Sequence, residues 1–477
     1  MRMGIVRGIS YGLFKEPDEF VPQARALGAG LVRAYIYWGQ VEPSPGEYDF
    51  HVVDTLLTQL DDNIEAWLTV CSSSPWATRQ ASDFLPPSPA KDVDQYREFV
   101  RRLVEHCAGR ITYWQCENEP SNTGLLWAGT AEEYVAQLTA FHAAVKSADP
   151  NATVVLGGCG YDVLDSPPGS EPRRFFAHLT DAGRDAFDVF DVHLYGDPAN
   201  IPSYVDDARA MMREYGYGKP VVAGEYAGPV LFEFPEVEPI LQQTMAGAFA
   251  EPVSQSVDEL VERVGQDTPE RRAMVTLYDR AEELPDRLRM FLEGCPAELA
   301  AKRDRINCRQ LVTRLLLTFS TGIRLASYWN LAPEVPGEME PYQMMHLLFG
   351  KLVLLGYDGT KLTRRTPAAD TFTLLAEKLA GATSVTRSED GYVFTVDRED
   401  RPRLLVLWDH RDTFDGEDQP PVPVSLPWTA PDASAVDAFG TPHKVEVRGG
   451  QLHTMLTDTP VFVEAVSPVP AAEFPIQ

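Results

Sequence analysis

Short runs of β-branched and aromatic residues alternate along most of the chain with longer segments in which apolar residues recur every three or four positions. The short runs predict eight strands, and the longer segments between them predict helices. The predicted strands are Gly4–Ile9, Leu31–Tyr37, Ile64–Cys71, Ile111–Glu117, Thr153–Gly158, Phe187–Leu194, Pro220–Tyr226 and Ile323–Trp329. The clearest predicted helices are Asp92–Cys107, Ala131–Ser147 and Tyr204–Glu214. This alternation is typical of α/β proteins with a parallel sheet.

Eight consecutive strand–helix units most simply close into a (β/α)8 barrel. The alternative is an open, doubly wound sheet, which usually carries a glycine-rich phosphate-binding turn after its first strand. The sequence has no such turn there. We therefore predict an α/β protein with a catalytic TIM barrel over residues 1–381.

The regular strand spacing ends after the seventh predicted strand. Between Pro229 and Ile323 the chain is far longer than one helix requires, and four segments have helical periodicity: Val237–Ala248, Val257–Val264, Glu270–Leu292 and Ala297–Thr318. The last is expected to be the barrel's own seventh helix, and the others to form an insertion over about 230–296. Insertions after a barrel strand lie on its active face, so we expect this one to border the site and set substrate length. A packing or dimerisation element, and with it a homo-oligomer, is the alternative.

After Gly381 the pattern changes to strand-like alternation interrupted by turn residues. The stretches that carry it read GYVFTVDR, PRLLVLWDH, VPVSLPW, HKVEVRGG and PVFVEA. A segment of this length with this pattern fits a small β-sandwich. We predict an all-β domain over residues 382–477.

Composition excludes several classes of partner. The chain has 42 Lys and Arg against 70 Asp and Glu, a net charge of −28, and no basic patch, which argues against nucleic acid and anionic membranes. No run approaches the length of a membrane-spanning helix. The first residues, MRMGIVRGIS, lack the apolar middle of a secretory leader, which predicts a cytoplasmic protein unless a leader has been trimmed.

Candidate chemistry gathers in the stretch WQCENEP, Trp114–Pro120, at the end of the fourth predicted strand. Polar residues at the carboxyl ends of barrel strands are the usual catalytic candidates. Alternation places Gln115, Glu117 and Glu119 on one side of the strand and Asn118 on the other. Because the alternation weakens beyond the strand end, Asn118 and Glu119 could both face the cavity.

A carboxylate at the rim needs a partner for acid/base chemistry, and the seventh strand supplies Glu225 in KPVVAGEYAGP. Glu119 and Glu225 would lie three strands apart, across the mouth of the barrel. Two such carboxylates suit glycosidic cleavage, in which one group protonates the leaving oxygen and the other stabilises an oxocarbenium-like centre. Metal chemistry is the competing class, but His193 is the only histidine at a predicted strand end, too few for a zinc site.

Asn118-Glu119-Pro120 after one apolar strand, with Glu225 after a second, resembles the retaining glycoside hydrolases of clan A, with family 39 or a near relative as the preferred match. In that clan the acid/base follows an asparagine on strand four, and the nucleophile ends strand seven. Other strands extend the resemblance: LVRAYIYWGQVEP with SPGEYDF on strand two, DVFDVHLYG on strand six and LASYWN on strand eight. The resemblance covers the whole predicted barrel.

The resemblance implies a role for each matching residue. Glu119 would be the acid/base and Glu225 the nucleophile, with Arg33 favouring its ionised form and Asn118 bonding the sugar 2-hydroxyl. Substrate-binding roles would fall to Arg33, Trp38, Asn118, His193, Tyr195 and Trp329. Glu42 also matches the strand-two motif of the family. Trp76, after SSSP, joins them as a candidate sugar platform, since a sugar's apolar face stacks on an indole ring.

Several of these residues have a purely structural interpretation. Trp38 and Trp76 could be core aromatics, and Glu117 is expected to support the site instead of acting as the acid/base. Tyr35 could belong to the core or to the site, and Asp191 is expected to be structural.

The function predicted from this resemblance is retaining hydrolysis of a glycosidic bond with no metal and no organic cofactor. Exo action on a β-xyloside, β-galactoside or arabinoside-type linkage is the preferred substrate prediction, because a bulky element beside the site closes a cleft into a pocket. The alternatives are endo action on a polysaccharide and a non-catalytic carbohydrate-binding barrel.

Overall fold

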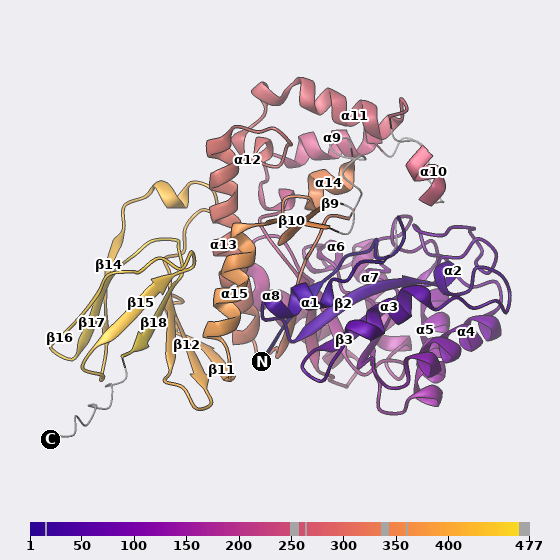
Figure 1. Cartoon of the computed structure of the whole chain (residues 1–477), viewed down its shortest axis with the longest axis horizontal. Helices are drawn as coiled ribbons and strands as arrows, with labels where there is room; N and C mark the ends of the chain where they lie inside the picture. Colours follow the sequence, from indigo (N-terminus) through magenta and orange to yellow (C-terminus); the bar gives the residue numbers. More distant parts are fainter. Residues whose placement is uncertain (15–16, 249–256, 263–264, 335–342, 359–360, 467–477) are drawn as a thin grey trace, which may run out of the picture. The chain divides into compact units, whose positions relative to one another are not determined.

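The computed structural model describes residues 1–14, 17–248, 257–262, 265–334, 343–358 and 361–466 (Figure 1). The chain divides into two compact units, Arg2–Thr373 and Leu374–Gln477, with Met1 assigned to the second. This division falls inside helix α15 (Pro367–Lys378), shortly before the predicted boundary at Gly381. Residues 249–256 and 263–264 of the predicted insertion, and residues 467–477 of the predicted sandwich, lie outside the described residues.

The first unit contains an eight-stranded parallel sheet in the order β5-β4-β3-β2-β1-β8-β7-β6. Parallel bridges between Val155 and Val189 and between Cys159 and Val192 join β5 to β6, so the sheet closes on itself. The predicted barrel is confirmed, and each of the eight predicted strands overlaps an observed one. The strands are β1 (Arg2–Val6), β2 (Leu31–Tyr37), β3 (Glu65–Cys71), β4 (Tyr113–Cys116), β5 (Thr153–Val155), β6 (Phe190–Leu194), β7 (Val221–Tyr226) and β8 (Leu325–Tyr328).

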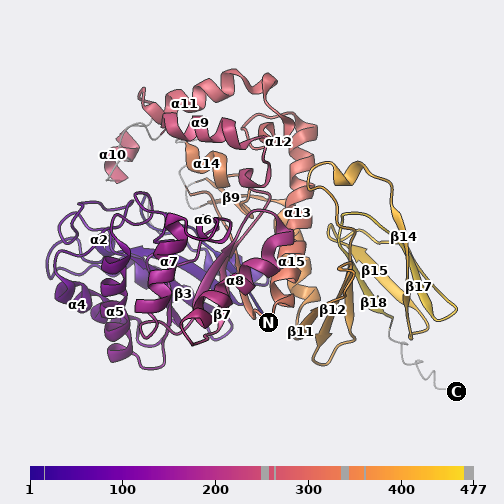
Figure 2. The ribbon, with the colours of Figure 1, turned by 180° about the vertical axis from the view of Figure 1, so that it is seen from behind.

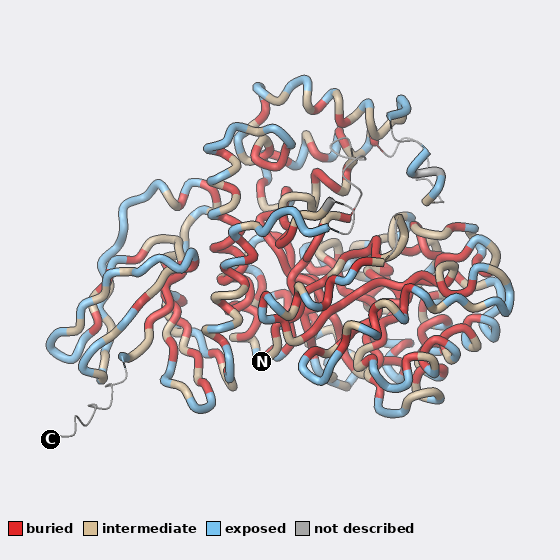
Figure 3. Tube along the Cα trace, viewed as in Figure 1, coloured by how far each residue is buried: buried red, intermediate tan, exposed pale blue. Residues whose placement is uncertain are grey.

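The strands form where apolar runs are buried on both faces, as a barrel requires. Every residue of β2, β6, β7 and β8 is buried, and Figure 3 shows the buried residues following the barrel strands. The polar residues inside these runs, such as Arg33 on β2 and His193 on β6, are therefore held in the interior. Such buried polar groups need partners, and they find them in one another.

The helices between the strands begin at the residues that their sequences indicate. Asp92 caps α4 by accepting from the backbone N–H of Asp94 at 2.8 Å, and Thr130 caps α5 in a capping box with Glu133. The barrel unit has the helices α1 (Val21–Ala26), α2 (Trp38–Val41), α3 (His51–Gln59), α4 (Val93–Cys107), α5 (Ala131–Ala148), α6 (Tyr161–Leu164), α7 (Glu171–Ala182), η1 (Pro198–Asn200) and α8 (Ile201–Glu214).

A helical insertion follows β7, as predicted. Its elements are η2 (Leu231–Glu233), α9 (Glu238–Ala248), α10 (Val257–Glu262), α11 (Pro269–Asp279), η3 (Ala281–Glu283) and α12 (Asp286–Arg289). The periodic segment Glu270–Leu292 is thus not one helix. Helix α11 ends at Asp279, the short turn η3 follows, and Pro285 then stands as the N-cap residue of α12.

The barrel's own seventh helix is α13 (Ala297–Ser320), which packs against α8, β7 and β8. The insertion also contacts the segment after β8. The backbone N–H of Met344, the first residue of α14 (Met344–Phe349), donates to Glu270 at 2.8 Å. Figure 1 and Figure 2 both place α9, α11 and α12 beside α14. A second contact comes from α10 of the insertion, where the backbone N–H of Val257 donates to Asp83, in the loop after β3, at 2.9 Å. The insertion therefore reaches loops at the carboxyl end of the barrel.

The second unit has two antiparallel sheets, in the orders β11-β12-β13-β18-β15 and β14-β17-β16. Leu407, Leu452, Leu456, Val461 and Val463 form the core between them, and the predicted sandwich is confirmed. Its elements are β11 (Ala382–Arg387), β12 (Val393–Arg398), β13 (Leu404–Leu407), η5 (Gly416–Asp418), β14 (Val422–Pro427), β15 (Ala433–Asp437), β16 (Val445–Arg448), β17 (Gln451–Leu456) and β18 (Val461–Ala465). The hairpin of β9 (Leu355–Asp358) and β10 (Lys361–Arg365) precedes them in the chain and belongs to the first unit. Among the described residues, no helix is both long and apolar enough to cross a membrane.

Candidate active site

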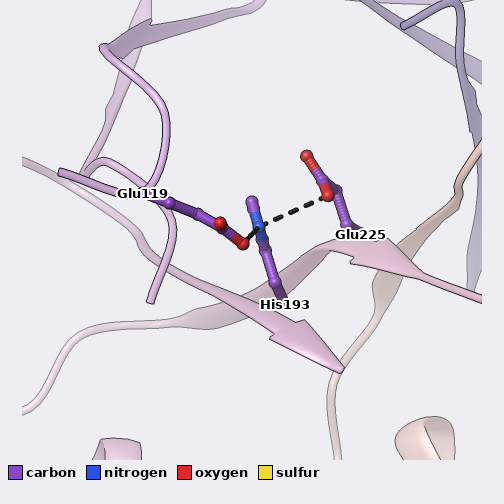
Figure 4. Close-up of side chains that lie close together, drawn as sticks. All are labelled: Glu119, His193 and Glu225. Carbon is purple, nitrogen blue, oxygen red and sulfur yellow. Dashed lines mark hydrogen bonds and ion pairs between the residues drawn. The ribbon is translucent and has the colours of Figure 1, made fainter. Parts of the chain in front are cut away.

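Three side chains from separate strand ends converge inside the barrel: Glu119 after β4, His193 on β6 and Glu225 on β7 (Figure 4). His193 Nδ1 lies 2.6 Å from Glu119 Oε1 and 3.4 Å from Glu225 Oε2. One donor atom of each residue lies within 4.8 Å of the others. The two glutamates that the sequence pairs across the barrel mouth are therefore neighbours, with the imidazole between them.

Glu225 is the most heavily hydrogen-bonded of these groups. Its Oε1 accepts from Arg33 Nη1 at 2.8 Å and from the Tyr35 hydroxyl at 2.8 Å, while its Oε2 accepts from the Tyr195 hydroxyl at 2.7 Å. Burial and then the charge of Glu225 raise the pKa of Tyr195 well above its usual range, so this hydroxyl stays protonated and donates. A guanidinium and two phenols thus stabilise a negative charge on Glu225.

Arg33 also fixes the residue before Glu119. Its Nη2 donates to Asn118 Oδ1 and to Gln115 Oε1, both at 2.8 Å. The Tyr35 hydroxyl reaches the same Asn118 oxygen at 3.1 Å. Because the Asn118 oxygen is occupied by donors, its amide nitrogen is the group that can donate to a ligand. One buried guanidinium therefore links β4 and the residues after it to β7 through hydrogen bonds.

His193 connects the pair to a second buried carboxylate. Its Nε2 lies 3.1 Å from Asp191 Oδ2, two residues earlier on the same face of β6. Burial lowers the pKa of His193, but the charges of Glu225 and Asp191 outweigh it and raise the pKa to about 10. The imidazole therefore carries a proton on both nitrogens and donates towards Glu119 and Asp191.

The end of β4 departs from simple alternation. Glu117 and Glu119 both have left-handed backbone conformations, with φ of 60° and 39°. The first turns Glu117 out of the barrel interior, where its Oε1 accepts from the Ser72 N–H at 2.9 Å and from Gln137 at 2.8 Å. As a result Asn118 and Glu119 both reach the site, whereas strict alternation would have admitted only one of them.

Burial raises the pKa of Glu117 to about 8, so its carboxyl group is neutral at pH 7. It lies behind the site, between the loop after β3 and helix α5, and has no contact with Glu225 in the structure. The position agrees with a supporting residue.

The three candidate tryptophans lie in different surroundings. Trp329 packs edge-on against Tyr35 at 6.3 Å and against Phe349 at 5.8 Å, beside the Glu225 cluster. Trp76 is partly exposed, and its indole N–H donates to the Glu42 carbonyl at 2.9 Å.

Trp38 is different, because it has no exposed surface and its ring stacks on Phe99 at 5.1 Å. Its indole N–H donates to Glu42 at 2.7 Å. A sugar cannot stack on a ring that the core covers on all sides. The sequence prediction of a substrate-binding Trp38 is corrected to a core position.

Glu119, His193 and Glu225 are also a group whose donor atoms could surround a metal ion. Two features disfavour that use. The Arg33 guanidinium already supplies a positive charge 2.8 Å from Glu225. Both ring nitrogens of His193 already contact carboxylates, Nδ1 that of Glu119 at 2.6 Å and Nε2 that of Asp191 at 3.1 Å. The arrangement suits proton transfer and carboxylate chemistry better than metal ligation.

Sequence reasoning missed or left open several residues that belong to this cluster. Tyr35 contacts Glu225, and Asp191 accepts from Gln115 at 2.8 Å as well as from His193. The spacing Asp-x-His on one strand was the available signal for Asp191. Asp162 lies beside Glu119 as well, since a Cβ atom at Gly160 would come within 2.5 Å of Asp162 Oδ1 and 2.9 Å of the Glu119 carboxyl carbon. Burial and then the charge of Glu119 raise the pKa of Asp162 to about 6. Nothing in the sequence indicated Asp162.

No family model and no curated protein sequence matches the chain. Solved structures do share its fold. A family 39 glycoside hydrolase from Bacteroides cellulosilyticus WH2 is 14% identical with a TM-score of 0.62, over 98% of this chain and 81% of that one. A monomeric beta-xylosidase from Caulobacter crescentus CB15 is 14% identical with a TM-score of 0.59, over 98% and 100%. A glucosidase from Croceicoccus marinus is 13% identical with a TM-score of 0.57, over 97% and 95%.

These likenesses span both units of the chain, so the combination of barrel and appended β-domain is shared. The fold implied by the sequence resemblance is confirmed. A common fold can host different reactions, and the chemistry must be argued from the site.

Proposed function

We propose that this protein is a retaining glycoside hydrolase with Glu119 as acid/base and Glu225 as nucleophile. The observation that carries the proposal is the proximity of the two carboxyl groups. One oxygen of Glu119 lies within 4.8 Å of one oxygen of Glu225, and His193 Nδ1 contacts both residues. This proximity favours the closer of the two arrangements that glycosidases use. Retaining enzymes hold their carboxyl groups about 5–5.5 Å apart, whereas inverting enzymes leave about 6.5–9.5 Å for a water molecule. The fold shared with a family 39 glycoside hydrolase and with a beta-xylosidase supports the same class.

In the first step, Glu225 attacks the anomeric carbon while Glu119 gives its proton to the leaving oxygen. The bond between the sugar and the leaving group breaks, and a covalent glycosyl ester of Glu225 forms. Arg33, Tyr35 and Tyr195 donate hydrogen bonds that stabilise the negative charge of the attacking carboxylate. His193 donates to Glu119 Oε1, which leaves Oε2 to carry the transferred proton.

In the second step, Glu119 is a carboxylate and takes a proton from water. The resulting hydroxide attacks the anomeric carbon from the side that the leaving group vacated, and the ester bond to Glu225 breaks. Two inversions give overall retention, and both carboxyl groups return to their starting states. No metal or organic cofactor takes part in either step.

Asn118 is the proposed partner of the sugar 2-hydroxyl, since its amide nitrogen is its remaining donor. Trp329 is the proposed apolar floor of the sugar site, and Trp76 is a more distant candidate platform. Arg33, His193 and Tyr195 act mainly by positioning the two carboxyl groups.

For the substrate we propose a terminal sugar in a β-xyloside, β-galactoside or arabinoside-type linkage. The helical insertion, which reaches the loops after β3 and β8, supports a closed pocket and exo action. A panel of 4-nitrophenyl glycosides measured beside polymeric substrates tests this. Release of mid-length oligomers from a polymer would favour endo action, and sugar binding without turnover would favour a non-catalytic barrel.

The role assignment is tested by replacing each carboxylate. Glu119→Ala should still form the covalent intermediate from substrates with good leaving groups, stall there, and recover with azide to give a glycosyl azide of retained configuration. Glu225→Ala should lose both steps, and azide should yield the inverted product. A 2-fluoroglycoside should label the peptide that contains Glu225. Labelling of Glu119 or Glu117 would reverse the assignment, and loss of activity on chelation would point to the metal alternative.

A further inference from the structure

A pair of stacked aromatic rings lies at the carboxyl end of the barrel, and the proposed mechanism does not use it. Tyr161 opens α6 after β5, and Phe232 belongs to η2 after β7. Their ring centroids are 5.8 Å apart and their planes are inclined by 18°. Two loops that are separate in sequence therefore meet through one face of each ring.

The chain holds Phe232 at the surface between two buried neighbours. Leu231 is 1% exposed, and the Glu233 carboxylate pairs with Arg314 of α13 and accepts from Gln310 at 2.6 Å. Phe232 itself is 39% exposed. Because its neighbours are fixed inwards, its ring projects outwards and keeps apolar surface in contact with water. What sets Phe232 apart from a single exposed apolar residue is its stacking on Tyr161, which gives two aromatic rings in contact.

Tyr161 is anchored as firmly. Its hydroxyl donates to Asp165 at 3.0 Å, and its ring lies against the backbone of Gly196. A Cβ atom at Gly196 would come within 2.3 Å of the Tyr161 ring, so a side chain there would displace the tyrosine. Gly196 directly follows Tyr195, the phenol that contacts Glu225. The Tyr161 ring is therefore packed against the loop that positions the nucleophile.

The residue before Tyr161 lies beside Glu119. A Cβ atom at Gly160, the residue before Tyr161, would lie 2.9 Å from the Glu119 carboxyl carbon. In a glycosidase the acid/base stands next to the leaving oxygen, so the leaving group extends from its side of the site. Tyr161 directly follows Gly160, so the stacked pair is attached to the segment that lies beside Glu119.

We propose that Tyr161 and Phe232 form the leaving-group subsite of this enzyme, and that the leaving group it takes presents a flat apolar face. An aromatic ring and the apolar face of a second sugar both have that chemistry, because each stacks on an aromatic side chain. This inference rests on the proposed glycosidase function and names the substrate part that the catalytic cluster does not contact.

Phe232→Ala tests the proposal, with Phe439→Ala as the matched control. Phe439 is 40% exposed but belongs to the second unit, so its removal should change neither activity nor selectivity. For the sugar that the enzyme accepts, kcat/KM is measured on the 4-nitrophenyl glycoside, the methyl glycoside and a disaccharide. Phe232→Ala should lower kcat/KM for the aryl glycoside about 3- to 10-fold and leave the methyl glycoside within about two-fold. Phe232→Tyr should keep the wild-type ratio.

The disaccharide separates the two sources of a flat apolar face. A parallel loss on the disaccharide assigns the subsite to a second sugar, and a loss confined to the aryl substrate assigns it to an aromatic aglycone. An unchanged ratio of aryl to methyl glycoside in an active Phe232→Ala enzyme would overturn the inference while the glycosidase function stands. Failure of the wild type to cleave any glycoside would instead overturn the function itself.

A second measurement does not depend on the leaving group's chemistry. Once the glycosyl ester has formed, an acceptor bound in the same subsite competes with water. Phenyl and methyl glycosides are offered together as acceptors, and the two transfer products are quantified. Phe232→Ala and Tyr161→Leu should each lower the preference for the phenyl acceptor. An equal preference in variants and wild type would contradict the proposed subsite.

Discussion

Two buried glutamates in the same barrel have opposite environments. Glu225, at the end of β7, accepts hydrogen bonds from a guanidinium and two phenols. Glu117, just after β4, accepts from a backbone N–H and a neutral amide, and its Oε2 has no partner among the described residues. Both side chains are almost completely removed from water. The two residues differ in the hydrogen-bond donors that their carboxyl groups receive.

Burial alone favours the neutral form of a carboxyl group, and only charged or numerous donors reverse that preference. At Glu117 the neutral donors do not suffice, and burial raises the pKa to about 8. At Glu225 the Arg33 charge is 2.8 Å away. The proposed nucleophile therefore lies beside a buried guanidinium, whereas Glu117 receives only neutral donors.

The largest expected effect comes from removing the carboxylate of Glu225. Glu225→Ala deletes the proposed nucleophile, and kcat should fall by about 10⁴-fold or more. The activity is measured on an activated aryl glycoside with and without azide, and circular dichroism checks the fold. Residual activity within a hundred-fold of wild type would show that another group is the nucleophile.

Removing the charge beside Glu225 should have the next largest effect. Arg33→Met leaves a buried carboxylate without its cation, which costs about 3–5 kcal/mol, so kcat/KM should fall about 10²- to 10³-fold. Arg33→Lys restores the charge but cannot reproduce the bonds to Glu225, Gln115 and Asn118 together, and should recover only part of the loss. If Arg33→Met kept kcat/KM within ten-fold in a folded protein, Arg33 would not be what stabilises the ionised nucleophile.

A single hydroxyl should matter less than the guanidinium. Tyr195→Phe removes one hydrogen bond to the Glu225 carboxylate, worth about 1.5–3 kcal/mol, and should lower kcat/KM about 10- to 100-fold. The control is Tyr226→Phe, since the buried Tyr226 hydroxyl on β7 has no hydrogen-bond partner among the described residues. Equal losses in the two variants would indicate a packing effect instead of a lost bond to Glu225.

The smallest effect on activity is expected at Glu117. Its raised pKa should instead make the free energy of unfolding depend on pH. The pKa rises from 4.5 to about 8 on folding, so between these values the folded chain retains a proton that the unfolded chain releases, and stability falls as pH rises. Glu117→Gln should remove this loss and stabilise the protein by about 1–3 kcal/mol more at pH 8 than at pH 5.

Denaturant unfolding of wild type and Glu117→Gln at both pH values gives the difference, with kcat/KM expected to stay within about three-fold. The exposed Glu19→Gln serves as control and should show no such pH-dependent gain. A Glu117→Gln protein that gains nothing at pH 8 would mean that Glu117 is ionised in the folded state.

The sequence predicted the eight strands because their apolar runs are bounded by turn residues and separated by clear helical periodicity. It also predicted the pairing of Glu119 with Glu225, since the carboxyl ends of all strands in a parallel barrel meet on one face. The segment Glu270–Leu292 was harder to predict, because its helical periodicity continues beyond Asp279, where helix α11 ends.

Only the tertiary structure decided the direction and surroundings of individual side chains. Trp38 and Trp329 both lie at strand ends in the sequence and both are buried, but Trp38 stacks on Phe99 of α4 whereas Trp329 packs against Tyr35 of the Glu225 cluster. The left-handed turns at Glu117 and Glu119 could not be read from residue types that rarely adopt them.

The sequence by itself determined the order of the elements and which strand ends carry acids, because hydrophobic periodicity and chain order are local properties. The tertiary structure decided how each buried acid is hydrogen-bonded. That choice depends on donors from β2, α5 and the loop after β6, which are distant in the chain and meet Glu225 and Glu117 only when the barrel closes. Electrostatic environment is a property of the fold, and no local pattern around either glutamate contains it.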